Sequence, residues 1–269
     1  MTSSIKSIMN ENVLDKTVLV RADLNIPMSN GNISDQSRVE RVIPTINFLK
    51  SSGAKIVICS HLGRPNGKYN KKYTLKPLVE ILSNILETNV RFSNSCLGQE
   101  ALEIKTSLKA GEILLLENVR FHEEETNNSL SFAKKLSEGC DLFVNDAFSC
   151  SHRAHSSLHA ITNFLPSYSG KLMDEEIKAL TSVLSAPIKP VAALVGGAKI
   201  STKINIIEYL MTKMDYLIIG GAMANTFLVA GGLNVGKSLF EKDSVNIAKS
   251  IMKKSKKINC EIILPIDVV

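Results

Sequence analysis

The feature that most restricts the fold of this chain is an alternation of short apolar runs with stretches of helical period. Apolar runs occupy residues 17–22, 55–60, 90–92, 113–116 and 142–145. Stretches with helical spacing of apolar residues separate them, at residues 38–51, 75–86, 97–108 and 130–138. This alternation predicts parallel strands joined by right-handed crossovers, with helices on both faces of the sheet.

A second alternating set follows a long helical pattern at residues 170–184 and a cluster of prolines. Its expected strands are residues 191–195, 216–219 and 261–264, and its expected helices are residues 201–211, 222–229 and 241–254. We therefore predict an α/β fold with two domains, each a Rossmann-like, three-layer arrangement of a parallel sheet flanked by helices. The expected divisions are residues 1–169, an inter-domain helix at 170–186, and residues 187–269.

Composition excludes several classes of function. The net charge of +6 is spread along the chain, and its one dense basic run, residues 253–257, indicates a solvated helix end. Without tryptophan or zinc-finger spacing, we expect no nucleic-acid partner. No apolar run is long enough for a membrane span, and the N-terminus lacks a signal-peptide core, so we expect a cytoplasmic protein without a membrane partner. The five cysteines include no C-x-x-C pair and indicate reduced packing residues and no metal site.

The arginines carry the strongest functional signal. All seven precede residue 154, and Arg21, Arg64, Arg120 and Arg153 lie at or just beyond the carboxyl end of an expected strand. Parallel strands bring these ends to one edge, where open α/β sheets bind ligands. Arg38, which opens the first helix, can reach the same edge. Clustered guanidinium groups repel one another, so they predict a small ligand with carboxylate and phosphate groups; the alternative is scattered surface salt bridges.

Other polar residues accompany these arginines. His61 in SHLGRP and His155 in SHRAHS can donate hydrogen bonds to an anion, although a single histidine is more often structural. Asp23 and Asn25 in VRADLNIP offer acceptors for a substrate hydroxyl. The alternative for this pair is an Asx-turn before Pro27.

The turn VGGAKISTK at residues 195–203 predicts a phosphate site in the second domain. Gly196 and Gly197 let the backbone approach a ligand, and a helix beginning near Ser201 offers unpaired N–H groups to an anion. Lys199 and Lys203 are four residues apart, so an anion between them would relieve their repulsion. The alternative is an ordinary strand-to-helix turn with two solvated lysines.

Seven motifs, in order and at matching spacing, resemble the phosphoglycerate kinase family. They are VRADLNIP, the Asp35/Arg38 loop leading into PTINFL, SHLGRP, LLLENVRFHEEE, VNDAFSCSHRAHSS, GGAKISTKI and LPIDVV. The resemblance runs from about residue 14 to the last residue. It implies a first domain that holds 3-phosphoglycerate, a second that holds Mg-nucleotide, and a hinge that closes the cleft between them. The implied reaction is the reversible glycolytic transfer of a phosphoryl group from 1,3-bisphosphoglycerate to ADP, giving 3-phosphoglycerate and ATP.

The resemblance also implies roles for individual residues. Phosphoglycerate binding falls to Asp23, Leu24, Asn25, Arg38, His61, Leu62, Gly63, Arg64, Arg120 and Arg153, with Arg21 and His155 completing the basic patch. Lys203 would bind nucleotide phosphate, and Arg38 and Lys199 would flank the phosphoryl group during transfer as the catalytic residues. Gly196, Gly197, Gly220 and Gly221 correspond to glycine pairs beside the nucleotide. Mg²⁺ would arrive with the nucleotide, and we expect a monomer.

The chain also departs from the family pattern. Ser149, Cys150 and Ser151 stand where the family often has Gly-Thr-Ala, and Ala222 stands where a third glycine is common. The sequence stops at Val269, directly after an expected strand, whereas the family continues with the metal-binding aspartate, the nucleotide-ribose contacts and a final segment. We therefore expect a truncated chain with an incomplete second domain and no protein ligand for the metal. Binding of 3-phosphoglycerate should persist, with little or no turnover.

Two other functions remain open. Gly231–Ser238, GGLNVGKS, fits the P-loop pattern, and ILPID could supply a metal-binding aspartate, as in a P-loop NTPase. A P-loop must directly follow a strand, and the preceding AMANTFLVA indicates a helix instead. The other alternative is a non-catalytic module that captures small phosphorylated acids.

Overall fold

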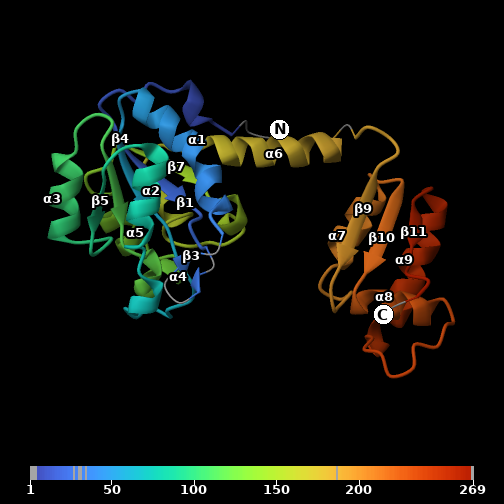
Figure 1. Ribbon diagram of the computed structural model, residues 1–269. Coiled ribbons are helices and arrows are strands. Elements are labelled where there is room, and N and C mark those ends of the chain that lie inside the picture. The colour runs from blue at the N-terminus through green and yellow to red at the C-terminus, as the bar shows by residue number, and fades with distance from the viewer. Residues whose placement is uncertain (1–4, 27, 30–31, 34, 186, 268–269) are drawn as a thin grey trace. The chain divides into compact units, whose positions relative to one another are not determined.

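The structure is a computed structural model that describes residues 5–267 apart from 27, 30–31, 34 and 186 (Figure 1). Pro27 of VRADLNIP and the last two residues of LPIDVV lie outside the described residues. The chain divides into two compact units, Met1–Lys178 and Ala179–Val269, which we call unit 1 and unit 2. The division falls within helix α6 (Lys171–Ser185), at the position where the sequence predicts a helix between domains.

Unit 1 is built on a six-stranded sheet in the order β5-β6-β4-β1-β7-β8, in which every pair is parallel. Its strands are β1 (Thr17–Ala22), β4 (Lys55–Cys59), β5 (Val90–Ser93), β6 (Ile113–Leu116), β7 (Leu142–Asp146) and β8 (Ser167–Ser169). The chain leaves β1 toward β4 and later returns to pair β7 with the other edge of β1. The strand order therefore reverses at β1, which is where ligands bind in open α/β sheets.

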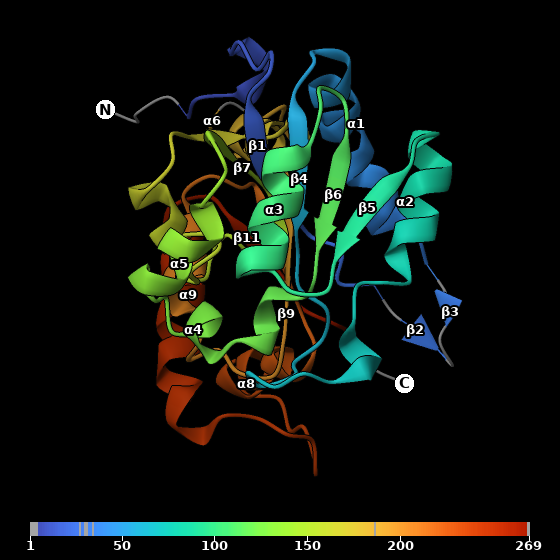
Figure 2. The same cartoon turned by 90° about the vertical axis from the view of Figure 1, so that its left-hand side faces the viewer.

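Helices cover both faces of this sheet (Figure 2). They are α1 (Ser37–Ser51), α2 (Leu78–Leu86), α3 (Gln99–Ser107), α4 (Glu123–Thr126) and α5 (Leu130–Ser137). Side chains alternate across each strand, so Val18 and Val20 of β1 pack in the cluster formed with α1 and α2. Leu19 packs on the other face with α3 and α5. Two separate apolar cores thus hold the six strands in place.

Two small features of unit 1 were not predicted. β8 pairs with β7, but its sequence, Ser-Tyr-Ser, has no apolar run to mark it as a strand. An antiparallel hairpin of β2 (Met28–Ser29) and β3 (Asn32–Ile33) follows the β1 loop. Strands of two or three residues are too short for hydrophobic period to indicate them.

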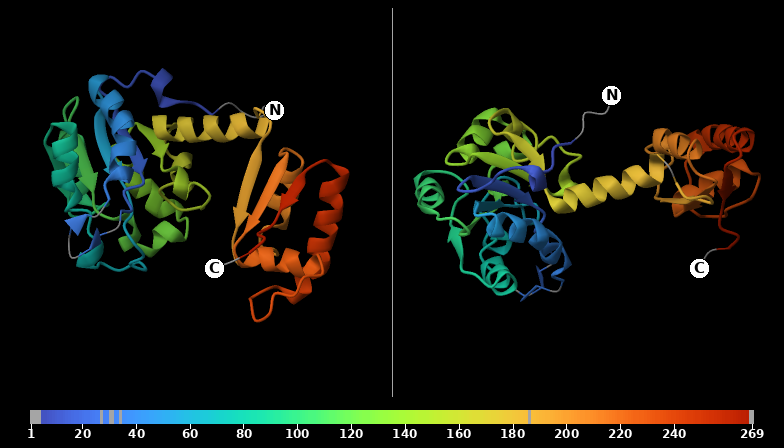
Figure 3. Two further views of the ribbon diagram at one scale, coloured as in Figure 1. Left: turned by 45° about the vertical axis from the view of Figure 1, so that its right-hand side comes forward. Right: turned by 90° about the horizontal axis from the view of Figure 1, so that it is seen from above.

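Unit 2 contains a three-stranded parallel sheet in the order β11-β10-β9 (Figure 3). The strands are β9 (Ala192–Gly196), β10 (Tyr216–Gly220) and β11 (Glu261–Ile263), and the helices are α7 (Ile204–Met211), α8 (Ala222–Ala230) and α9 (Val245–Lys257). All three helices contribute to one core, with Val195, Leu217 and Ile219 from the sheet. The alternate strand residues form the opposite face, where Leu194, Tyr216 and Ile263 are exposed.

The predicted α/β fold is confirmed. The three-layer arrangement predicted for both domains is present in unit 1, whereas the described helices of unit 2 pack on one face of its sheet and make two layers. Several helix ends also differ from the prediction. The helix expected from residue 75 begins at Leu78, directly after Pro77, and the one expected from residue 201 begins at Ile204 after a turn. The helix expected from residue 241 begins at Val245, after a 3₁₀ turn at Lys242–Ser244. Among the described residues, no helix combines the length and apolar character that crossing a membrane requires.

Candidate functional site

The loops that follow four neighbouring strands of unit 1 enclose a polar cleft. β6, β4, β1 and β7 are adjacent and parallel, so their carboxyl ends open on one edge of the sheet. The cleft has a volume of about 260 Å³. It is lined by Asp23, Asn25, Arg38, His61, Gly63, Arg64, Arg120, Ser149, Cys150 and Arg153. Eight of these ten were predicted as ligand-binding residues, and they meet as the strand-end argument requires.

The loop after β1 supplies the polar groups of one wall. Asp23 Oδ2 accepts a hydrogen bond from Arg38 at 2.8 Å and another from the Ser149 hydroxyl. Asp23 Oδ1 accepts from the Asn25 backbone at 3.1 Å, so the Asx-turn alternative is also present. The Asn25 side chain in turn accepts from the Gly63 backbone N–H at 2.8 Å. Hydrogen bonds therefore hold this loop to the neighbouring loops in the absence of a ligand.

The SHLGRP loop after β4 is held from below by Asn118. Its side-chain amide donates to the carbonyl oxygens of Leu62 at 2.8 Å and Tyr73 at 2.9 Å. Gly63 has φ of +62°, and a Cβ there would lie 2.3 Å from the Tyr73 ring, so glycine is required. The loop thus has a fixed shape and presents Arg64 to the cleft.

Arg120 and Arg153 supply cations that lack full partners within the described structure. Arg120 is only 6% exposed and donates to the Gly63 carbonyl at 2.9 Å, yet its buried Nε has no hydrogen-bond partner among the described residues. Burial, followed by the nearby charges of Arg153 and Arg21, lowers the pKa of Arg120. Arg153 Nε lies 3.2 Å from His152 Nε2. An anion placed between these guanidiniums would relieve both the desolvation and the repulsion.

A second cavity of about 380 Å³ adjoins the cleft and shares Arg64, Arg120 and Arg153 with it. His155, predicted as part of the basic patch, lines this cavity. Burial lowers the pKa of His155, while the Glu125 carboxylate opposes that effect. The arginines therefore face two connected spaces, enough for an anion with two charged ends.

Three predicted ligand residues line neither cavity. Arg21, Leu24 and Leu62 are buried beneath the cleft. The Leu24 backbone N–H donates to the Ser60 hydroxyl at 2.9 Å, and the Leu62 carbonyl is used by Asn118. Arg21 donates to Ser157, His61 and the Ala22 carbonyl. Within the described structure these three residues lie beneath the cleft, and their hydrogen bonds hold its loops in place.

Two cleft residues were not predicted as ligand contacts. Ser149 and Cys150 reach the cleft from the 3₁₀ turn Phe148–Cys150, which follows β7. The signal that could have found them is the same strand-end position that identified Arg153. Cys150 also packs with Ala147 and Leu158, and Cys59, Cys96 and Cys260 lie in the larger apolar cores, as expected of packing residues.

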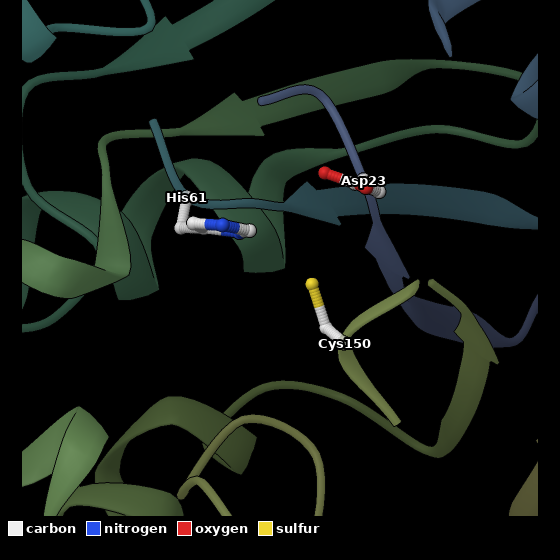
Figure 4. Close-up of side chains that lie close together, drawn as sticks. All are labelled: Asp23, His61 and Cys150. Atoms are coloured by element: carbon white, nitrogen blue, oxygen red, sulfur yellow. The ribbon is translucent and has the colours of Figure 1, made fainter. Parts of the chain in front are cut away.

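Figure 4 shows Asp23, His61 and Cys150 around a common gap, with their potential ligand atoms within 4.8 Å of one another. No other group of three His, Cys, Asp or Glu ligands meets within the part of the chain that the structure describes. The donor set does not suit Mg²⁺, which prefers oxygen ligands, because it contains one carboxylate already paired with Arg38. The surrounding arginines also oppose a divalent cation.

In unit 2 the predicted glycine turns meet at the ends of β9 and β10. A Cβ on Gly221, whose φ is +66°, would lie 2.8 Å from the Gly197 carbonyl oxygen, and that oxygen accepts a hydrogen bond from the Met223 N–H at 2.8 Å. A Cβ on Gly197 would lie 3.0 Å from the Lys203 side chain, which therefore lies along the Gly197 backbone. Lys203 is the N-cap residue of α7, at the end of the helix that favours anions.

The remaining predicted residues of this turn are open to solvent or carry no side chain. Lys199 is exposed on the loop between β9 and α7, and Gly196 and Gly220 end their strands. The P-loop candidate Gly231–Ser238 follows helix α8 and no helix starts directly behind it, so its geometry differs from that of a P-loop.

Comparisons with known proteins agree with this architecture. The family model described as phosphoglycerate kinase matches residues 8–269. The chain belongs to the phosphoglycerate kinase family. It is 49% identical over 252 residues to a phosphoglycerate kinase of Methylorubrum extorquens, and 47% identical over 265 residues to one of Borrelia garinii subsp. bavariensis. The solved phosphoglycerate kinase of Coxiella burnetii is similar with a TM-score of 0.86 at 40% identity, over 98% of this chain.

The chain spans only part of these relatives. The alignments cover 94% and 98% of this chain but 63% and 67% of the two bacterial kinases. They cover 67% of the solved Coxiella burnetii chain. Membership of the family therefore rests on about two thirds of the length of its curated members.

Proposed function

We propose that unit 1 binds 3-phosphoglycerate or 1,3-bisphosphoglycerate, and that unit 2 contributes part of an ADP/ATP site. The proposed reaction is the reversible transfer of a phosphoryl group between 1,3-bisphosphoglycerate and ADP. The observation that carries this proposal is the convergence of Arg38, Arg64, Arg120 and Arg153 on a single cleft at the reversal point of the sheet. The family of the chain supports the same function.

The chemistry of the cleft suits a small phosphorylated hydroxy acid. Guanidinium groups match carboxylate and phosphate oxygens in pairs, and partly buried ones gain most from such a partner. Asp23 and Asn25, on the opposite wall, offer oxygen acceptors to a hydroxyl group. A ligand that has two anionic ends and a hydroxyl between them would use every class of side chain in the cleft.

The turn of unit 2 suits a polyphosphate. The glycines at the ends of β9 and β10 let a ligand approach the backbone, and Lys203 and the start of α7 add positive charge beside them. Lys199 is exposed on the same loop, so its flexible side chain can turn toward a phosphate. We assign the nucleotide phosphates to this turn.

Phosphoryl transfer demands alignment and charge stabilisation more than covalent chemistry from the protein. Arg38 and Lys199 are proposed to stabilise the charge on the transferring group. The carboxylate of the acid is itself the nucleophile or leaving group, so no general base is needed. The family implies Mg²⁺ with the nucleotide, but the described residues offer no ligand set that fits it.

The alternative is a non-catalytic module that captures phosphorylated acids. One observation favours it: the complete cleft lies in unit 1, and the unit 2 turn is exposed. Isothermal calorimetry with 3-phosphoglycerate and with ADP, run separately, distinguishes the two functions. Binding of both ligands supports a kinase, binding of the acid alone supports the module, and absence of acid binding contradicts both. A coupled assay adds a further test, because turnover by the chain would contradict the module.

A further inference from the structure

Beneath the cleft, a buried carboxylate begins a chain of hydrogen bonds that ends at His61. Glu125 of α4 is fully buried. Its two oxygens accept hydrogen bonds from Ser157, one from the backbone N–H at 2.9 Å and one from the hydroxyl at 2.7 Å. Because Ser157 must donate its only hydroxyl proton to this carboxylate, its oxygen is left as an acceptor on the other side.

Arg21 of β1 uses that acceptor. Its Nε donates to the Ser157 oxygen at 3.0 Å, one terminal nitrogen donates to the Ala22 carbonyl, and the other lies 3.0 Å from His61 Nδ1. The side chain is 0% exposed, so each of these contacts replaces water. The guanidinium is planar, and with Nε and both terminal nitrogens engaged its orientation is fixed.

The contact with Arg21 determines which nitrogen of His61 carries the proton. A guanidinium has donors and no acceptor, so His61 Nδ1 must accept and cannot carry a hydrogen. The proton of the neutral ring is then on Nε2. His61 lines the cleft, and Nδ1 is occupied by Arg21, so Nε2–H is the donor that remains for a ligand.

We propose that the buried hydrogen bonds from Glu125 through Ser157 and Arg21 fix His61 as the neutral tautomer that presents Nε2–H to the bound acid. We assign Glu125 and Ser157 as positioning residues that hold this tautomer through Arg21. The inference rests on the proposed function for the identity of the acid, but not for the state of the ring. It gives Arg21 a role beneath the cleft in place of a direct contact with the ligand.

A neutral donor has a clear use in this cleft. Arg120 and Arg153 line the same cleft as His61, and His155 lines the adjoining cavity. Arg21 lies below the ring, and Asp23 and Cys150 lie across the gap. Burial, followed by the charge of Arg21 and then of the other cations, lowers the pKa of His61 to about 2. The ring can therefore donate to an anion without adding another positive charge to a crowded cluster.

His155 lies near Glu125 but takes no part in the hydrogen bonds that connect Glu125 to His61. His155 Nδ1 is 3.8 Å from Glu125 Oε1, beyond hydrogen-bonding distance, and it has no partner among the described residues. Both hydrogen bonds that the Glu125 carboxylate accepts within the described structure are donated by Ser157 instead. Ser157 is thus the link through which the carboxylate acts on Arg21.

The test begins with the free protein. Long-range ¹H–¹⁵N correlation spectra of the histidine rings should show His61 with a protonated Nε2 and an unprotonated Nδ1, unchanged between pH 5.5 and 8. A proton on Nδ1, or a ring that titrates in this range, would overturn the inference. The measurement needs no ligand, so it also stands if 3-phosphoglycerate fails to bind and the proposed function is wrong.

Two serine variants then separate positioning from general stability. Ser157→Ala removes the link, and Ser156→Ala is its matched control. Ser156 is equally buried, but it donates to the carbonyls of Glu124 and Ser129 and not to the chain that reaches His61. We expect Ser157→Ala to give mixed or broadened His61 signals and at least fivefold weaker 3-phosphoglycerate binding, and Ser156→Ala to change neither. Wild-type signals in Ser157→Ala would contradict the assignment.

Substitution of His61 itself tests the donor. Both variants below lose the Nδ1 acceptor of Arg21, so they differ in whether an N–H faces the cleft. His61→Gln keeps a neutral N–H near the position of Nε2 and should bind 3-phosphoglycerate within about threefold of wild type. His61→Ala removes the donor and should bind at least tenfold more weakly, which is about 1.4 kcal/mol. Equal affinities of these two variants would show that the ring donates nothing to the acid.

Discussion

The two sheets of this chain differ in how completely they are covered, and their candidate sites differ in the same way. The sheet of unit 1 has a core on each face, and its cleft loops are fixed by buried hydrogen bonds from Asn118 and Arg120. The sheet of unit 2 has helices on one face, and Leu194 on the other is 73% exposed. Parallel sheets normally bury both faces, so unit 2 should be the weaker of the two.

The difference extends to the cations. In unit 1 Arg120 is buried and donates to the Gly63 carbonyl. Its side chain therefore loses little conformational entropy when a ligand binds. In unit 2 Lys199 is exposed, and Lys203 is placed mainly by packing of its stem against Gly197. The sheet of unit 1, which is covered on both faces, therefore carries a site whose cations are already in place. The sheet of unit 2, which is covered on one face, carries a turn whose lysines are less fixed.

The largest expected effect comes from a matched pair of leucines. Leu19→Ala in β1 removes a fully buried side chain and should lower the free energy of unfolding of unit 1 by about 2–5 kcal/mol. Leu194→Ala in β9 removes an exposed one and should cost unit 2 less than about 0.5 kcal/mol. Hydrogen exchange of amides in β1 and β10 measures each unit separately. A loss of several kcal/mol for Leu194→Ala would show that this face is covered in solution.

Asp146, at the end of β7, should make the free energy of unfolding depend on pH by about 2 kcal/mol. Its side chain is fully buried; one oxygen accepts from the Met173 N–H at 3.0 Å, and the other has no partner among the described residues. Burial raises the pKa of Asp146 to about 6, although the nearby Thr45 side chain and the α6 backbone amides oppose the change.

The sign follows from proton linkage. Between pH 4 and 6 the folded state holds this proton more tightly than the unfolded state, so the stabilisation is present below pH 4 and is lost as pH rises through 6. Urea unfolding of wild type and Asp146→Asn at pH 4.5 and pH 7 measures it. From pH 4.5 to pH 7 the free energy of unfolding of the variant should rise by about 2 kcal/mol relative to that of wild type, because of the shift of about two pKa units. A constant difference would contradict the burial of an unpaired carboxylate.

A smaller effect is expected at the glycine turn of unit 2. Gly221→Ala places a side chain at φ of +66° and within 2.8 Å of the Gly197 carbonyl oxygen, so it should destabilise unit 2 by about 1–2 kcal/mol. Gly220→Ala is the control, because its Cβ meets no heavy atom within 4 Å. Faster hydrogen exchange in β10 should follow the first substitution only. Equal exchange rates would mean that the two turns do not touch in solution.

The smallest expected effect concerns the lysines of unit 2. Lys203→Ala should weaken ADP binding by about fivefold to tenfold, because it removes one exposed charge–phosphate contact. Lys237→Ala, in the P-loop-like Gly231–Ser238, should leave the dissociation constant unchanged. Calorimetry with ADP measures both variants, and the reverse pattern would favour the P-loop alternative.

The convergence of the cleft arginines was predictable, because it depends only on where residues lie relative to strand ends. Arg64, Arg120 and Arg153 follow β4, β6 and β7, and parallel pairing brings those ends together whatever the details of packing. The glycine turn was predictable for the same reason. Neither inference needed side-chain conformations.

The orientation of Arg21 was a different problem. It lies within β1, and period two places it on the face of Leu19, which helices cover. That signal favours a buried guanidinium. Its partner Ser157, and Glu125 to which Ser157 donates, lie more than a hundred residues away, and no local pattern pairs them. Ser149 and Cys150 were missed because neutral side chains at a strand end resemble an ordinary turn.

The most direct test of the account is calorimetric titration of 3-phosphoglycerate into wild type, Arg153→Ala and Arg91→Ala. Arg153 lines both cavities, whereas Arg91 lies in β5 and donates to Ser107. We expect wild type to bind the acid and Arg91→Ala to match it. Arg153→Ala should weaken binding by about 10- to 100-fold through loss of a charge-assisted pair. Absence of binding by wild type, or equal binding by all three, would contradict the convergence of cations on a ligand cleft.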